Sequence, residues 1–203
     1  MLKVLVLYYS RHGSVAEMAT QVCNGIEQVA ETESVLRRAP EIATTTEQTE
    51  NSIPDSGPPF VNLDDLKNCS GLALGSPGRF GNMAAPLKYF LETSSSLWLA
   101  GALNGKPGTV FTATSSMHGG QESTLLSMMT PLLHHGMLIT GIPYSVPELS
   151  STTSGGTPYG ASHVSGANNN QALTQDEIQI CKAQGKRLAQ TAHALHKAAL
   201  NSQ

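Results

Sequence analysis

Three loops of this sequence contain residue types suited to binding a phosphorylated, planar ligand. The first consists of Ser10, Arg11, His12, Gly13, Ser14 and Val15. It offers two hydroxyls and a glycine directly before a predicted helix, whose free N–H groups and partial positive charge attract anions. The loop has neither the lysine of a triphosphate-binding loop nor the glycine pattern of a dinucleotide site. It therefore indicates a monophosphate, although an ordinary strand-to-helix turn would also account for it.

The second loop begins with Pro77, Gly78, Arg79 and Phe80. Its proline and glycines predict an irregular backbone with exposed amide and carbonyl groups, which suit the polar edge of a ring system. The permanent charge of Arg79 would favour a reduced, anionic flavin. The alternative is a glycine-rich turn with a surface arginine and a packed phenylalanine.

The third loop follows a predicted strand and is rich in small and hydroxylated residues. It comprises Ala113, Thr114, Ser115, Ser116, Met117, His118 and Gly119. Such residues let backbone amides approach a flat ligand. Ligands of open α/β sheets bind outside the carboxyl ends of the strands, so all three loops are expected at one edge of one sheet.

Several other side chains have two interpretations each. His134 ends a predicted helix, where a protonated imidazole is favoured, and it either faces the site or caps the helix. His12 lies at the mouth of the pocket or in solvent. Trp98 is an interface anchor or an aromatic wall for a planar substrate. Three further histidines have no carboxylate or cysteine partner at ligand spacing, which argues against a metal site: His163, His193 and His196.

The elements that position these loops follow from hydrophobic periodicity. Apolar runs predict strands at residues 2–9, 34–38, 71–75, 109–114 and 137–142. Helical spacing and capping signals predict helices near 15–29, 62–68, 84–93, 121–134 and 174–200. Residues 94–105 are predicted to be a loop. Five apolar strands alternating with helices predict a doubly wound α/β fold with a parallel sheet and helices on both faces.

Length and composition limit the class of protein. The 203 residues suit a single domain over 1–203, with excursions at about 40–61 and 143–172. A net charge of −3 without a basic stripe argues against nucleic acid as a partner, and no apolar segment is long enough for a membrane span. Three widely spaced cysteines suit buried thiols in a reducing compartment: Cys23, Cys69 and Cys181. We therefore expect a cytoplasmic protein.

Five motifs in order give the chain an end-to-end resemblance to a known family. They are VLVLYYSRHG, GSPGRFGNM, SLWLAGALNGK, LLHHGM and GGTPYGAS. With them the chain resembles the WrbA family of flavodoxin-like NAD(P)H:quinone oxidoreductases. The resemblance implies a flavodoxin-like fold, non-covalently bound FMN, and a homotetramer whose active sites combine residues of more than one subunit.

The same resemblance implies roles for individual residues. The loop Ser10 to Val15 would bind the FMN phosphate, residues 78–80 would run along the isoalloxazine ring, and the loop Ala113 to Gly119 would cover its other side. His134 and Trp98 would line the pocket, with Trp98 supplied by a neighbouring subunit. His12 stands where family members often have an aromatic residue, near nicotinamide and quinone. Phe80 and Trp98 would enclose planar substrates.

The chain departs from the family pattern at two places. Position 78 is usually threonine but is glycine here, which predicts weaker FMN binding than in a Gly78→Thr variant. The turn Ser115 to Gly120 is less glycine-rich than the family pattern, so the contacts implied there are less direct.

The implied activity is two-electron reduction of quinones by NADH or NADPH in a ping-pong reaction, with Arg79, Trp98 and His134 in catalytic roles. Two alternatives come from other functional classes. One is a flavodoxin-like one-electron carrier, although such carriers tend to be strongly acidic and this chain is nearly neutral. The other is a non-catalytic regulatory flavoprotein, which nothing in the charge pattern favours. The sequence does not distinguish NADH from NADPH.

Overall fold

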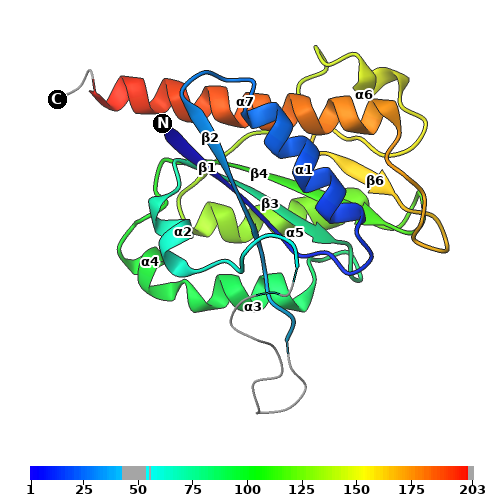
Figure 1. The fold of residues 1–203 in the computed structure, drawn as a ribbon, viewed down its shortest axis with the longest axis horizontal. Helices are drawn as coiled ribbons and strands as arrows, with labels where there is room; N and C mark the ends of the chain where they lie inside the picture. Colours follow the sequence, from blue (N-terminus) through cyan, green and yellow to red (C-terminus); the bar gives the residue numbers. More distant parts are fainter. Residues whose placement is uncertain (43–53, 55, 201–203) are drawn as a thin grey trace.

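The computed structural model describes residues 1–42, 54 and 56–200 as one parallel sheet between two helical layers (Figure 1). The strands are β1 (Leu2–Tyr8), β2 (Thr32–Arg38), β3 (Gly71–Pro77), β4 (Pro107–Thr114), β5 (Leu138–Ile139) and β6 (Ser162–Val164). Their order is β2-β1-β3-β4-β5, and β6 pairs with β4. All pairings are parallel, as expected of a doubly wound flavodoxin-like fold.

The helices are α1 (Ser14–Ile26), α2 (Leu63–Asn68), α3 (Ala85–Thr93), α4 (Ser95–Leu99), α5 (Gln121–His134), α6 (Glu148–Ser151) and α7 (Gln175–Leu200). A capping box formed by Asn62 and Asp65 begins α2, as the sequence predicts. A second box begins α7, where the Glu177 amide donates to Thr174 Oγ1 and the Thr174 amide donates to the Glu177 carboxylate. None of the described helices is long and apolar enough to cross a membrane.

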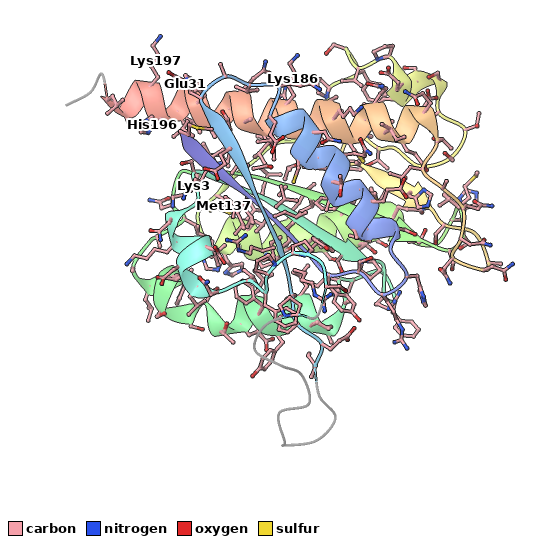
Figure 2. All side chains as sticks on the ribbon, in the orientation of Figure 1. Lys3, Glu31, Met137, Lys186, His196 and Lys197 are labelled. Carbon is pink, nitrogen blue, oxygen red and sulfur yellow. The ribbon has the colours of Figure 1, made fainter. Side chains whose placement is uncertain are left out.

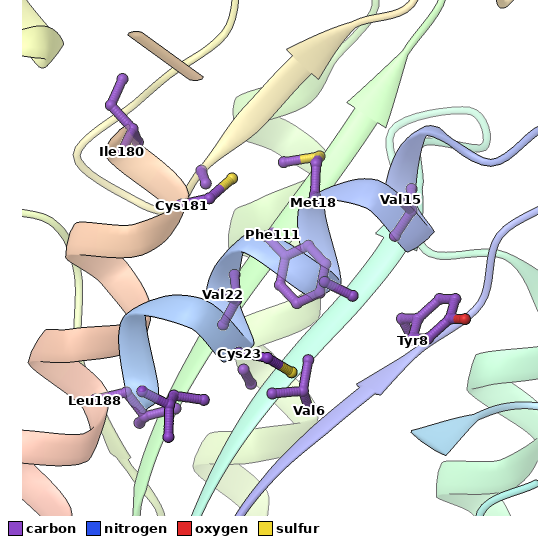
Figure 3. Close-up of a cluster of buried hydrophobic side chains, with 14 of the residues drawn as sticks. Val6, Tyr8, Val15, Met18, Val22, Cys23, Phe111, Ile180, Cys181 and Leu188 are labelled. Atoms are coloured by element: carbon purple, nitrogen blue, oxygen red, sulfur yellow. The ribbon is translucent and has the colours of Figure 1, made fainter. Parts of the chain in front are cut away.

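The apolar side chains of strand β1 alternate between two hydrophobic cores, one on each face of the sheet. Val4 and Val6 face α1 and α7, whereas Leu5 and Leu7 face the layer that contains α2, α3 and α5. Both sets are fully buried, because a central parallel strand is covered on both faces. Figure 3 shows the first core, with Phe111 of β4 between the sheet and the two helices.

Helix α7 lies across α1 at very short range. Glycines stand where the two backbones meet: a Cβ at Gly185 would lie 2.0 Å from the Val22 carbonyl oxygen, and one at Gly25 would lie 2.0 Å from the Lys182 carbonyl oxygen. The outer side of α7 is polar, and Lys186 and Lys197 point away from the sheet (Figure 2). This close packing fixes α1, whose N-terminus forms part of the site described below.

Three expectations about the fold were wrong. The fifth strand was expected at 137–142 but covers only Leu138–Ile139, since the chain turns away and Ile142 bonds to Pro158 instead. A sixth strand, β6, takes the free length of β4 beyond β5. The expected loop at 94–105 contains α4, whose Trp98 amide donates to the Ser94 carbonyl.

The expected excursion at 143–172 contains α6 and β6. The expected excursion at 40–61 lies mostly outside the described residues.

Candidate cofactor and substrate site

The carboxyl ends of β1, β3 and β4 surround a pocket of about 190 Å³. The three loops singled out in the sequence supply most of its lining: Ser10, Arg11, His12, Ser14, Val15, Pro77, Gly78, Arg79, Ala113, Thr114, Ser115, Ser116 and Gly119. They come together because parallel strands deliver their loops to one sheet edge. The pocket thus lies where an open α/β sheet binds its ligand.

The loop after β1 prepares the N-terminus of α1 for an anion. Gly13, the residue before the helix, has a φ of 98°, a conformation that disfavours side chains, and it makes no side-chain cap. Its amide donates to Ser10 Oγ at 3.2 Å, which fixes the turn. The amides of the first helical turn therefore face the pocket without a capping side chain, next to the Ser14 hydroxyl. This is a phosphate-sized anion site.

The loops after β3 and β4 are held against each other beneath the pocket. The Gly78 amide donates to the Ala113 carbonyl at 2.9 Å, and Thr114 Oγ1 donates to the Ser116 carbonyl at 2.8 Å. A Cβ on Gly78 would lie only 2.8 Å from Thr114 Cγ2 and 3.2 Å from Thr124 Oγ1. Glycine at this position is therefore matched to its neighbours, which the sequence alone did not show.

Arg79 and Phe80 form the rim. Reciprocal backbone bonds between Arg79 and Asn82 close a tight turn, and Phe80 at its tip has a φ of 52° and a fully exposed ring. The Arg79 guanidinium donates to the Gly78 carbonyl at 3.0 Å, which places a permanent cation at the pocket's edge. A ring system seated there would meet both the charge and the aromatic face.

A wider recess of about 620 Å³ continues from this rim. It shares Arg11 and Arg79 with the first pocket, and Tyr9, Glu41 and Lys88 are among its other lining residues. The Tyr9 hydroxyl donates to the Glu41 carboxylate, and burial together with that bond raises the pKa of Tyr9 to about 12. The recess has room for a second planar ligand beside the first.

Two lining residues were missed by sequence reasoning. Ser165 and Asn169 follow β6 and complete the pocket. The Ser165 amide and hydroxyl both donate to the Thr114 carbonyl, at 2.8 and 3.1 Å. Ser165 and Asn169 lie in a polar stretch without apolar periodicity, so the signal in the sequence was that stretch itself, which contains three consecutive asparagines.

Other expected site residues lie elsewhere within this chain. Trp98 and His134 line a separate apolar pocket of about 340 Å³ between α3, α4 and α5, where Trp98 Nε1 donates to the His134 carbonyl at 2.8 Å. The indole ring is half exposed. Met117 and His118 are exposed beside the first pocket without lining it. A single subunit therefore does not bring Trp98 to the loops after β1, β3 and β4.

Next to His134, His135 is half buried, and its Nε2 lies 3.0 Å from Ser94 Oγ. Burial, assisted by His134, lowers the pKa of His135. Its Nδ1 has no hydrogen-bond partner among the described residues, which also favours the neutral ring.

His163 has a carboxylate partner in the fold, although none stands at metal-ligand spacing in the sequence. Its Nδ1 lies 2.8 Å from Glu177 Oε2, and both side chains are buried. The sequence separation of 14 residues hides this contact, which depends on β6 packing beside α7. The described residues nevertheless contain no group of three or more potential metal ligands.

Comparisons with known proteins agree with this geometry. The family model for NADPH-dependent FMN reductases matches residues 2–148. The chain belongs to that family. The matched residues include the loops after β1, β3 and β4, which supply most of the residues that line the pocket.

Solved structures share the fold at low identity. A WrbA-like flavodoxin from Agrobacterium tumefaciens superposes with a TM-score of 0.66 at 18% identity, covering 96% of this chain and 99% of that one. Flavodoxin 1 from Bacillus cereus gives 0.60 at 14% identity, with 93% and 97% covered. A flavone reductase gives 0.65 at 11% identity, with 97% and 65% covered. These similarities establish a flavodoxin-like fold for the chain.

Proposed function

We propose that this protein is an FMN-dependent NAD(P)H:quinone oxidoreductase. The observation that carries the proposal is the convergence of three strand-end loops on one pocket that opens at the uncapped N-terminus of α1. The lining fits the phosphate and ribityl chain of FMN. Helix amides and the Ser10 and Ser14 hydroxyls suit a dianionic monophosphate. When bound, FMN would supply transfer of two electrons from a nicotinamide to a quinone.

The chain's own residues hold and polarise that group. The backbone of residues 77–79 would run along the polar edge of the flavin ring, and the loop Ala113 to Gly119 would lie on its other side. Arg79 would stabilise negative charge at the rim, because the hydrogen bond to the Gly78 carbonyl holds its guanidinium at the edge of the pocket. Burying the ring against the β-strand ends excludes water from that side.

The recess beside the rim is the proposed substrate site. Phe80 offers an exposed ring for stacking in this recess, and His12 lines the first pocket. One recess used first by the nicotinamide and then by the quinone would give ping-pong kinetics.

A neighbouring subunit would complete this site. The face formed by α3, α4 and α5 exposes large apolar side chains, with Leu99 78% and Trp98 50% exposed. Leu126, Leu133 and Tyr89 are exposed on these helices too, and such patches mark interfaces. We propose a homotetramer in which this face brings Trp98 and His134 to another subunit's flavin. His134 would there assist protonation of the reduced quinone.

Steady-state kinetics test the activity. The purified protein, loaded with FMN, is assayed for NADH and NADPH oxidation with and without benzoquinone. We expect quinone-dependent oxidation and parallel lines in double-reciprocal plots. Oxidation that depends on added free FMN instead of quinone would make the protein a flavin reductase. Absence of oxidation with either acceptor would leave the electron-carrier alternative.

The Trp98→Ala variant links the oligomer to the activity. We expect a higher KM for benzoquinone and weakened assembly, measured by light scattering after gel filtration. Tyr144→Ala is the matched control, since it removes an exposed ring that lies outside both pockets and outside the face formed by α3, α4 and α5. A monomeric wild-type protein with full quinone activity would contradict the shared site.

A further inference from the structure

A buried ion pair lies behind the pocket, outside the residues assigned so far. His163 of β6 and Glu177 in the first turn of α7 are 1% and 0% exposed. The imidazole Nδ1 lies 2.8 Å from Glu177 Oε2. Its Nε2 lies 3.1 Å from the backbone carbonyl oxygen of Gln171. Both ring nitrogens thus face oxygen atoms at hydrogen-bond distance.

The surrounding donors determine where the protons are. A carbonyl oxygen can only accept, so Nε2 must carry a proton. Glu177 Oε1 accepts from Ser154 Oγ at 3.0 Å and from the Gly155 amide at 2.9 Å, and Oε2 accepts from the Thr174 amide at 2.8 Å. Burial would raise the pKa of Glu177, but the bonds from His163 and these amides outweigh it and lower that pKa. Since this carboxylate is ionised, Nδ1 also carries a proton, and His163 is an imidazolium.

The imidazolium holds a loop of the cofactor pocket. Gln171, whose carbonyl it binds, also donates its amide to the Ser165 carbonyl at 3.0 Å, which closes residues 165–171 into a compact loop. Ser165 and Asn169 of this loop line the pocket. Asn169 has a φ of 53°, a left-handed conformation that asparagine adopts readily, and its Oδ1 accepts from Ser165 Oγ at 3.2 Å. The loop is held by Thr114 at one end and by His163 at the other.

We propose that His163, protonated and paired with Glu177, is a positioning residue that fixes the loop 165–171 against the bound cofactor. The proposal rests on the function proposed above in one respect only: the ligand is taken to be FMN. Its consequence is that replacing either partner removes the ion pair and loosens the loop.

Two measurements without flavin test the ion pair itself. Nitrogen NMR of histidine-labelled protein at neutral pH should show two ring N–H groups for His163. The amides of Ser165 and Gln171 should be protected from hydrogen exchange, and that protection should fall in His163→Gln and Glu177→Gln. A single ring N–H on His163, or equal protection in all three proteins, would overturn the proposal. His193→Gln is the matched control, because His193 is a partly exposed histidine of α7 whose Nε2 lies 3.5 Å from Glu31 Oε2.

A titration with FMN then tests the positioning role. Loss of a hydrogen bond to a charged group predicts about tenfold weaker FMN binding in His163→Gln than in the wild type. Glu177→Gln should resemble His163→Gln, and circular dichroism establishes that both are folded. Folded variants that bind FMN as tightly as the wild type would overturn the positioning role. A wild type that protects the loop but does not bind FMN would instead contradict only the proposed function.

Discussion

Substitution of Gly78 tests how closely the pocket floor is packed. The family pattern predicts that threonine at this position would strengthen FMN binding by adding a hydroxyl, worth about 0.5–1.5 kcal/mol. The structure reverses that expectation for the single substitution. The new Cβ would lie 2.8 Å from Thr114 Cγ2, and Thr114 cannot rotate without losing the bond from its hydroxyl to the Ser116 carbonyl. Overpacking of this kind costs about 1–3 kcal/mol.

The added hydrogen bond and the overpacking together predict that Gly78→Thr loses about 1 kcal/mol of FMN binding free energy, which is roughly fivefold weaker binding. Thr114→Ser removes the obstructing methyl group and keeps the hydroxyl. The double variant should therefore bind FMN at least as tightly as the wild type, with a coupling energy of about 1–2 kcal/mol in the double-mutant cycle. Quenching of flavin fluorescence gives all four dissociation constants. Tighter binding in Gly78→Thr alone, or no coupling, would refute the packing argument.

Four further predictions concern other parts of the molecule. Arg79→Ala should make the flavin midpoint potential more negative, and an unchanged potential in a redox titration would dismiss the charge argument. Gly185→Ala should destabilise the protein by at least about 1–3 kcal/mol in urea, because its methyl group would meet the Val22 carbonyl at 2.0 Å. The pKa of His135 lies below its ordinary value of 6.5, so stability should fall as pH drops below that value, and less so in His135→Gln. Burial raises the pKa of every thiol, so Ellman's reagent should label none of the native cysteines at pH 8 and all of them in urea: Cys23, Cys69 and Cys181.

The sequence predicts the central strands because each is a continuous apolar run, which can be recognised without knowing which strands it pairs with. Residues 4–8 of β1 and all residues of β3 and β4 are buried, and each run is followed by a loop of small or charged residues. The geometry of parallel sheets then places those loops together. Most of the pocket lining follows from this reasoning.

The rest depends on tertiary contacts that no local pattern records. Strand β6 has three residues and exists because β4 extends beyond β5. Ser165 and Asn169 enter the pocket only through that pairing. The contact between His163 and Glu177 likewise requires β6 to pack beside α7. At Gly78, a family comparison shows the missing hydroxyl, whereas only coordinates show the methyl group of Thr114 that occupies its space.

The most direct test of the central claim compares FMN with riboflavin, which has the same ring but no phosphate. The free amides of α1 and the hydroxyls of Ser10 and Ser14 are proposed to bind that phosphate. Two charge-assisted hydrogen bonds, at about 1.5–3 kcal/mol each, predict that the protein without flavin binds FMN at least a hundredfold more tightly than riboflavin. Equal affinity for the two flavins would contradict the assignment of this pocket.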